Sequence, residues 1–384
     1  MLPYEIAAQT TPSVYSPIPL SSFLDQQLYE TSPVHADANM PINGKLGLCA
    51  LGGSETVLQH ATGDQVGWWY TYQTWVPDET QIDWANKNKI EFVPMIGYHQ
   101  VTSQGWKKCD MVEDPDHPEW KCDVNDLIDQ LDKTQAQLDV KMQYLLGFNE
   151  PWDTNWHLKW KKYIAPEDAA KYWAEYFMPI SKATGLKLVS PSTTMKTNVD
   201  QFGWFVKFVQ TCWELDDCDV ETIDVIAMHH YTCFHDEMVD TYDVNSTSSK
   251  SFYQKLIKEL TDASWKGHDQ FDWKTWALGL PIWFTEHSCS GEHWEGKQYP
   301  LDVNNVQGCH RIMGDKGADW GAGSVQAIKD MDNVHRLSWF LAHTGTADFA
   351  DSAMFNDNGE LLPLARAMFN DLDPSKVDCE AEPR

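Results

Sequence analysis

The chain has 384 residues, of which 42% are hydrophobic and 22% charged, and a formal net charge of −28. A chain of this size can bury a large core, and α/β barrels of more than 250 residues commonly form one domain. The acidic balance would repel phosphate backbones and anionic headgroups, so we expect neither a nucleic-acid partner nor a membrane partner.

Residues 1–43 carry many Pro, Ser and Thr and show no hydrophobic periodicity. Such a segment is typical of an extended or partly disordered N-terminal arm. Beyond it, the chain contains no run of 18 apolar residues that would predict a membrane span.

From Lys45 onward, eight short apolar runs alternate with helical or loop-like stretches. Most of the runs are almost continuously apolar, as expected for strands that are buried on both faces of a parallel sheet. The runs cover residues 45–51, 67–72, 91–98, 143–150, 187–193, 224–231, 281–288 and 336–343.

Helical patterns lie between several of these runs, at residues 125–138, 166–182 and 324–334. Eight strands alternating with helices in one chain predict an α/β protein with a (β/α)8 barrel, the TIM-barrel class. We assign residues 44–372 to this single domain and 373–384 to a C-terminal tail. The long connections after the third, sixth and seventh strands are expected on the C-terminal face of the barrel, where such enzymes have their active sites.

Two glutamates end predicted strands on that face. Glu150 follows Gly147-Phe148-Asn149 at the end of the fourth strand, and Glu286 ends the seventh. One such glutamate is usually solvated or salt-bridged, but two on strands across the barrel can face one central site. A retaining glycosidase needs its two carboxyl groups about 5–5.5 Å apart.

The segments LLGFNEP and PIWFTE around these glutamates resemble clan A glycoside hydrolases, and within the clan family 128, the endo-β-1,3-glucanases. The similarity extends to EFVPMIGY, IDVIAMHHY, HRLSWF and FNDNGELLPLARAMF, over roughly residues 45–370. The resemblance implies a retaining enzyme with Glu150 as acid/base and Glu286 as nucleophile. It also implies internal cleavage of a neutral β-1,3-glucan of laminarin or curdlan type.

The chain departs from the family pattern at Trp152, at His287 and in the second strand, WWYTYQTW. These departures leave the exact glycan open. Two alternatives therefore stand beside the β-1,3-glucanase: a clan A hydrolase of another β-glycan, and a non-catalytic β-glucan-binding protein.

Further substrate-binding candidates surround the two glutamates, and each has a plain packing alternative. Asn149 can bind a sugar hydroxyl, and aromatic rings can stack on sugar faces. His229 and Tyr231 lie two residues apart and therefore on one face of a strand, where Tyr231 could donate to the nucleophile. The full set is Asn149, Trp152, His229, Tyr231, Trp339, Trp69 and Tyr70.

No cofactor and no metal are expected. His287, Glu292 and His293 lack the spacing of a metal motif, and neither a nucleophile elbow nor a phosphate-binding loop occurs. The nine cysteines include no C-x-x-C pair, so disulfides are the favoured interpretation, with at least one thiol left over. The Asn245 sequon agrees with a secreted or cell-wall-associated protein, and we expect a monomer.

Overall fold

The structure is a computed structural model that describes residues 46–49, 66–76, 78–101, 122–152, 163–194, 200–230, 249–287, 331 and 333–340. The chain divides into two compact units, Met1–Pro33 and Val34–Arg384, and every described residue belongs to the second. The predicted arm over 1–43 and the predicted tail over 373–384 lie outside the described residues.

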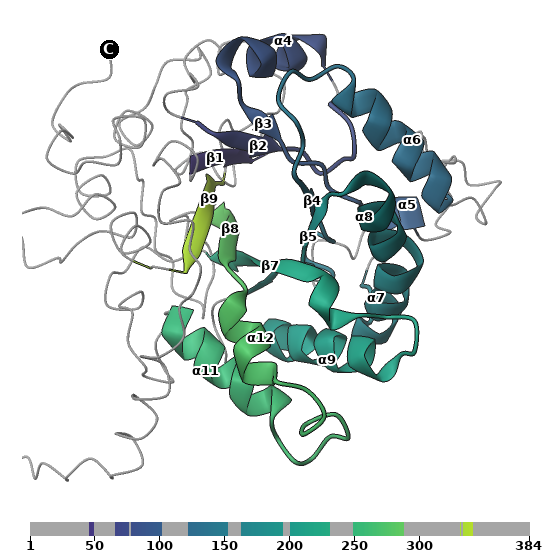
Figure 1. Ribbon diagram of the computed structural model, residues 1–384. Helices are drawn as coiled ribbons and strands as arrows, with labels where there is room; N and C mark the ends of the chain where they lie inside the picture. Colours follow the sequence, from purple (N-terminus) through teal and green to yellow (C-terminus); the bar gives the residue numbers. More distant parts are fainter. Residues whose placement is uncertain are drawn as a thin grey trace, which may run out of the picture. The chain divides into compact units, whose positions relative to one another are not determined.

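Parallel strands form one sheet in the order β3-β2-β1-β9-β8-β7-β5-β4, with β6 beside β7 (Figure 1). Each of the eight predicted apolar runs supplies a strand, and the fifth run supplies both β5 and the start of β6. The strands are β1 (Leu46–Cys49), β2 (Trp68–Tyr70), β3 (Glu91–Phe92), β4 (Tyr144–Leu146), β5 (Lys187–Val189), β6 (Thr193–Thr194), β7 (Ile223–His230), β8 (Ile282–His287) and β9 (Val334–Trp339).

The two ends of this strand order meet. Met95, just beyond β3, forms a parallel bridge with Leu146 of β4. The Leu146 amide donates to the carbonyl of Pro94 at 2.8 Å, and the Ile96 amide donates to Leu146 at 3.2 Å. The sheet therefore closes on itself, and the predicted (β/α)8 barrel class is confirmed.

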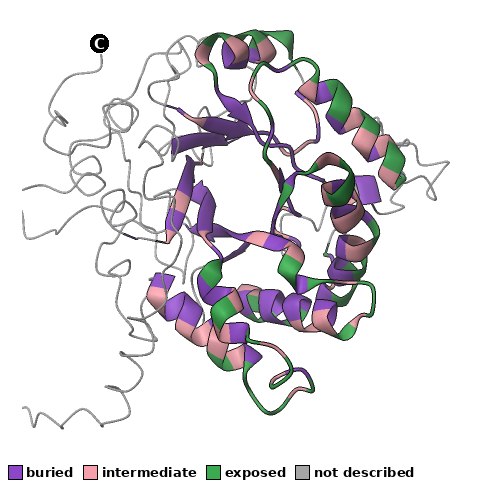
Figure 2. Ribbon diagram, in the orientation of Figure 1, coloured by how far each residue is buried: buried purple, intermediate pink, exposed green. Residues whose placement is uncertain are grey.

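Helices lie outside the strands, with their buried faces toward the sheet and exposed residues on the opposite side (Figure 2). Side-chain caps begin several of them: Asp78 accepts from the Thr80 amide, and Asp123 and Asp126 form a capping box. The helical elements are α4 (Glu79–Asn88), α5 (Tyr98–Val101), α6 (Val124–Gln135), α7 (Pro166–Tyr172), η1 (Trp173–Phe177), α8 (Met178–Thr184), α9 (Asp200–Glu214), η2 (Val220–Thr222), α11 (Ser249–Leu260) and α12 (Trp273–Gly279).

Two of the three predicted helices are confirmed. Residues 125–138 correspond to α6, and 166–182 correspond to the continuous segment α7–η1–α8, which includes a π-helical turn next to Pro179. Proline lacks the amide donor of a regular helix, which accounts for a local change of hydrogen bonding there. The third range, 324–334, lies mostly outside the described residues, and Val334 opens strand β9 rather than ending a helix.

Aromatic and aliphatic side chains fill the barrel interior. The cluster comprises Cys49, Trp68, Tyr70, Val93, Met95, Leu146, Val189, Val225, Ala227 and Trp283. One ion pair is buried with it: Arg336 Nη2 lies 2.6 Å from Glu91 Oε2, and the guanidinium lies 4.2 Å from the centre of the Trp283 ring. The interior of the barrel is therefore a packed core rather than a channel.

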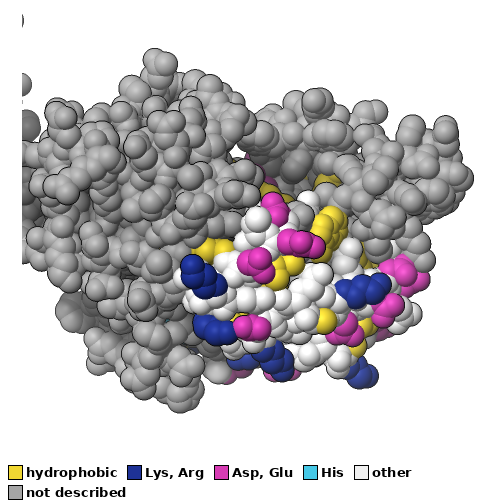
Figure 3. Space-filling view, turned by 90° about the horizontal axis from the view of Figure 1, so that it is seen from above, with side chains coloured by type: hydrophobic (Ala, Val, Ile, Leu, Met, Phe, Trp, Pro, Cys, Tyr) yellow, Lys and Arg dark blue, Asp and Glu magenta, His cyan; other side chains and the backbone are white. Residues whose placement is uncertain are grey.

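Among the described residues, no helix is both long and apolar enough to cross a membrane. Acidic and basic side chains are interspersed over the described part of the face drawn in Figure 3. One disulfide joins Cys212 to Cys218, and Cys49 is a free, buried thiol.

Candidate active site

Glu150 and Glu286 both emerge from the carboxyl ends of parallel strands. Glu286 lies in β8, and its side chain is 4% exposed. Glu150 lies four residues beyond the end of β4, and its side chain is 15% exposed. One oxygen of each carboxyl group and Nδ1 of His229 all lie within 4.8 Å of one another. The two predicted carboxylates therefore meet in one site.

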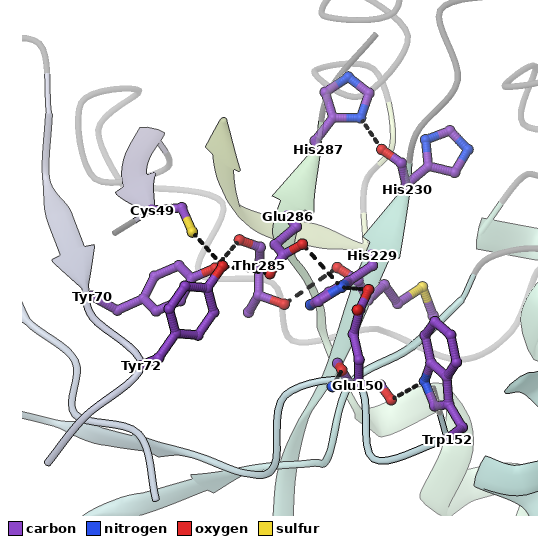
Figure 4. Close-up of polar contacts among 12 residues, drawn as sticks. Cys49, Tyr70, Tyr72, Glu150, Trp152, His229, His230, Thr285, Glu286 and His287 are labelled. Carbon is purple, nitrogen blue, oxygen red and sulfur yellow. Dashed lines mark hydrogen bonds and ion pairs between the residues drawn. The ribbon is translucent and has the colours of Figure 1, made fainter. Parts of the chain in front are cut away.

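His229, on β7, lies between the two carboxyl groups (Figure 4). Its Nδ1 atom lies 2.6 Å from Glu150 Oε1 and 3.2 Å from Glu286 Oε2. The register of β7 and β8 shifts after Met228 and then pairs His229 with Glu286. Irregularities of this kind commonly re-aim side chains at active sites.

The electrostatic surroundings of His229 favour its protonated form. Burial by itself would lower the pKa of His229, but the charges of Glu286 and Glu150 and the hydrogen bond to Glu150 together raise that pKa above its ordinary value. The carboxyl groups on either side thus stabilise positive charge on the imidazole between them.

Tyr72 is a second partner of Glu286. Its hydroxyl donates to Glu286 Oε1 at 2.8 Å, and the Cys49 thiol lies 3.2 Å from the same hydroxyl. Tyr70 is tied to β8, because its hydroxyl donates to the Thr285 carbonyl at 2.7 Å. The two oxygens of Glu286 thus have partners on different strands, which fixes the orientation of the carboxylate.

The turn that carries Glu150 has an unusual backbone. Glu150 has φ +41°, a conformation that non-glycine residues rarely adopt. Its amide donates to the Ser192 hydroxyl at 2.7 Å, and the indole of Trp152 donates to the Ser192 carbonyl at 3.1 Å. Gly147 lets β4 pass close to β5, since a Cβ atom there would lie 2.6 Å from Pro191 N. Backbone strain of this kind is frequent at functional sites.

Asn149 and Trp152 flank Glu150. The buried Asn149 Oδ1 has no hydrogen-bond partner among the described residues, so it can accept from a bound hydroxyl. Trp152 is half-buried and lies beside Glu150 in Figure 4. Both residues are placed where contact with a substrate at Glu150 is possible.

Three aromatic candidates lie elsewhere. Trp69 packs against Trp84 of α4 and against Phe92. Side chains alternate between the two faces of a strand, and the neighbouring Trp68 and Tyr70 occupy the barrel interior. Trp69 therefore faces the helices, contrary to the expected sugar contact. Tyr70 is fully buried and offers no free face for stacking.

Trp339 is also fully buried. Its ring lies 5.3 Å from the ring of His287, and His287 points away from the carboxylate cluster in Figure 4. Trp339 is thus packed in the core beside His287, and its expected contact with sugar stays a prediction. The remaining candidate, Tyr231, lies outside the described residues.

Metal ligation can be considered at two places. The donor atoms of Glu150, His229 and Glu286 are close enough together to hold an ion. In the structure His229 Nδ1 forms a hydrogen bond with Glu150 at 2.6 Å and an ion pair with Glu286 at 3.2 Å, and the absence of a metal remains a prediction. His287 donates from Nδ1 to the His230 carbonyl at 2.9 Å, whereas Glu292 and His293 lie outside the described residues.

Sequence reasoning overlooked three contacts: the donor role of Tyr72, the thiol of Cys49 and the hydroxyl of Ser192. Tyr72 lies two residues after Tyr70, and this spacing places both residues on the interior face. Cys49 ends β1 and Ser192 follows β5, at the same end of the barrel as the glutamates. A search for polar side chains at all strand ends would have found them.

The barrel and its paired carboxylates define a protein of the glycosidase type. The family model described as glycosyl hydrolase catalytic core matches residues 47–368, so the chain belongs to that family. No curated protein gives a significant match.

Two solved structures are similar to this chain. An endo-β-1,3-glucanase of family 128, subgroup II, from Pseudomonas viridiflava is 20% identical, with 85% of this chain and 96% of that chain covered and a TM-score of 0.52. An oligosaccharide-binding protein of subgroup VII from Cryptococcus neoformans is 16% identical, with coverages of 89% and 98% and a TM-score of 0.48.

Proposed function

We propose that the protein is a retaining endo-β-1,3-glucanase of glycoside hydrolase family 128. The observation that carries the proposal is the close approach of Glu150 and Glu286, since one carboxylate oxygen of each lies within 4.8 Å of the other. Retaining glycosidases hold their carboxyl groups about 5–5.5 Å apart, whereas inverting enzymes leave about 6.5–9.5 Å for a water molecule.

In this mechanism Glu286 attacks the anomeric carbon while protonated Glu150 delivers its proton to the leaving oxygen. The bond from the anomeric carbon to the leaving oxygen breaks, and a glycosyl ester forms on Glu286. Glu150 then removes a proton from water, which attacks the anomeric carbon and frees Glu286 with net retention. The donor Tyr72 and the imidazole of His229 hold Glu286 in place for attack.

The β-1,3-glucan substrate is supported by the motifs around the two glutamates and by the activity of the Pseudomonas viridiflava protein. A neutral glucan also suits a chain with a net charge of −28, because it is not repelled. Secretion or cell-wall association and a monomeric state complete the proposal.

Polysaccharide hydrolysis tests it. Wild type, Glu150→Gln and Glu286→Gln are compared on laminarin, curdlan, a β-1,4-glucan and a mannan, and ¹H NMR follows the anomer that forms first. We expect β-anomeric, internal products from β-1,3-glucan and large losses in both variants. Full activity in either variant would refute the assignment, preferential cleavage of another polymer would favour a different β-glycan hydrolase, and binding without turnover would favour a glucan-binding protein.

A further inference from the structure

The nucleophile candidate has a hydrogen-bond partner that arrives from an unexpected strand end. Tyr72 lies two residues beyond β2, and its hydroxyl donates to Glu286 Oε1 at 2.8 Å. The Tyr72 ring stands at 87° to the ring of Tyr70, at 5.8 Å between centres. Tyr70 is itself anchored to the Thr285 carbonyl at 2.7 Å, so the position of the Tyr72 ring is defined by its surroundings.

The direction of the next hydrogen bond follows from counting protons. A phenol has a single proton, and Tyr72 gives it to Glu286. The Cys49 sulfur lies 3.2 Å from the Tyr72 oxygen, which can then only accept. A hydrogen bond across this contact therefore runs from the thiol to the phenol oxygen.

Cys49 is suited to remain a donor. It lies at the end of β1 and is fully buried. Burial raises the pKa of the Cys49 thiol well above its usual value, and the nearby charge of Glu286 raises it further. The sulfur thus keeps its proton at every pH at which a glucanase would work.

We infer that Cys49 and Tyr72 form a directed hydrogen-bond relay, from thiol to phenol to carboxylate, that positions Glu286 and favours its ionised form. The inference rests on the proposed function, because it assigns Cys49 and Tyr72 as positioning residues for the nucleophile of that reaction. Donation by the thiol polarises the phenol and makes it a stronger donor to the carboxylate.

The other groups around Glu286 explain why such a relay is useful. Glu150 brings a second carboxyl group within 4.8 Å, and negative charge developing there as its proton is transferred opposes a second negative charge on Glu286. His229 lies 3.2 Å from Oε2 but is closer to Glu150, at 2.6 Å. The relay through Tyr72 acts on the opposite oxygen, Oε1, and is not shared with Glu150.

The test uses Tyr72→Phe, Cys49→Ala and Cys49→Ser in the full chain. Tyr176→Phe is the matched control, since it removes another buried phenol, which donates to the Cys122 carbonyl at 3.2 Å and lies outside the carboxylate cluster. Rates on laminarin are measured against pH, and thermal unfolding identifies any variant that does not fold.

For Tyr72→Phe we expect kcat to fall about 10- to 100-fold with little change in KM, the range expected for a hydrogen bond to a charged group. The acidic limb of the pH profile should move to higher pH. In Cys49→Ala, kcat should fall by about 3- to 10-fold, and the acidic limb should move to higher pH by a smaller amount. Cys49→Ser keeps a donor, so its kcat should lie close to that of the wild type. Tyr176→Phe should leave the limb in place.

A readout without turnover separates this inference from the proposed function. In protein labelled with ¹³C at the glutamate carboxyl carbons, the resonance missing from Glu286→Gln identifies Glu286, and its titration midpoint should rise in Tyr72→Phe. If wild type cleaves no glucan but the midpoint rises, the proposed function fails and the relay stands. An unchanged midpoint in Tyr72→Phe, or equal loss in Cys49→Ser and Cys49→Ala, would overturn the relay. Should Cys49→Ala not fold, Tyr72→Phe and Cys49→Ser decide the question.

Discussion

Nδ1 of His229 lies 2.6 Å from Oε1 of Glu150, and the imidazole is almost completely buried. The same nitrogen lies 3.2 Å from Glu286, so one ring contacts both carboxyl groups. Because the pKa of His229 is raised, against the effect of burial, by the charges of the two glutamates, the ring contributes positive charge between them.

Replacing His229 with Gln should move the acidic limb of the pH profile of activity to higher pH. Without the positive charge 3.2 Å from Oε2, the ionised form of Glu286 is less favoured. We expect kcat/KM at neutral pH to fall about 100-fold, within the range for positioned acid–base groups. The adjacent His230→Gln is the control, because the His230 side chain points away from the cluster in Figure 4. Profiles that coincide after scaling would contradict the role given to His229.

Gly147→Ala should destabilise the protein and lower its activity together. The added Cβ atom would lie 2.6 Å from Pro191 N and 2.8 Å from Ser190 C, which are backbone atoms that cannot rotate away. We expect a loss of about 1–3 kcal/mol in the free energy of unfolding, the range for overpacking, and a displaced Glu150 turn.

Gly203→Ala provides the matched comparison. Gly203 lies in α9 with open space around its missing side chain, and alanine is the better helix former there. We expect the free energy of unfolding to rise by about 0.5–1 kcal/mol and the activity to stay unchanged. Urea unfolding of both variants measures the difference, and a stable, fully active Gly147→Ala would show that β4 and β5 can separate without consequence.

The buried pair of Arg336 and Glu91 should behave non-additively. Removing either partner leaves an uncompensated charge in the barrel interior. Arg336→Leu and Glu91→Leu should therefore each lower the free energy of unfolding by about 3–5 kcal/mol. The double variant should lose much less than the sum of the two, because no charge then remains buried. Urea unfolding of the four proteins gives the coupling free energy, and additive losses would show that the two side chains stabilise the barrel independently.

The barrel itself was readable from the sequence because its strands are buried on both faces and so appear as apolar runs. The eight runs and the helices at 125–138 and 166–182 follow from local periodicity. The π-helical turn near Pro179 and the division of the fifth run into β5 and β6 do not, because they depend on hydrogen bonds made only in the folded chain.

The site was predictable where it depends on strand ends and less so where it depends on side-chain direction. Glu150, Glu286 and His229 were brought together as expected from their positions. Trp69 and Trp339 are packed against neighbouring side chains, an arrangement the sequence could not distinguish from sugar contact, because aromatic residues stack on sugars and fill cores equally well. Which of the two occurs depends on the face of the strand, and for Trp339 on a register shift between β8 and β9 that no local pattern encodes.

His287 should make the protein sensitive to acid. It is fully buried, and this burial lowers its pKa to about 4, although the hydrogen bond to the His230 carbonyl opposes the shift. In the unfolded chain a histidine has a pKa of about 6.5. Between these values the unfolded state binds the proton and the folded state does not, so stability is lost as the pH falls from about 6.5 to about 4 and levels off below.

The full contribution of this one residue is about 3 kcal/mol, from a difference of about 2.5 between the folded and unfolded pKa values. His287→Asn keeps a donor for the His230 carbonyl but cannot be protonated. Urea unfolding of wild type and variant at pH 7 and pH 4 isolates the effect, because all other groups titrate in both proteins. Between pH 7 and pH 4, the free energy of unfolding of the wild type should fall by about 3 kcal/mol more than that of the variant. Equal losses would mean that His287 is protonated in the folded state, and that the packing of its ring against His230 and Trp339 tolerates a charge.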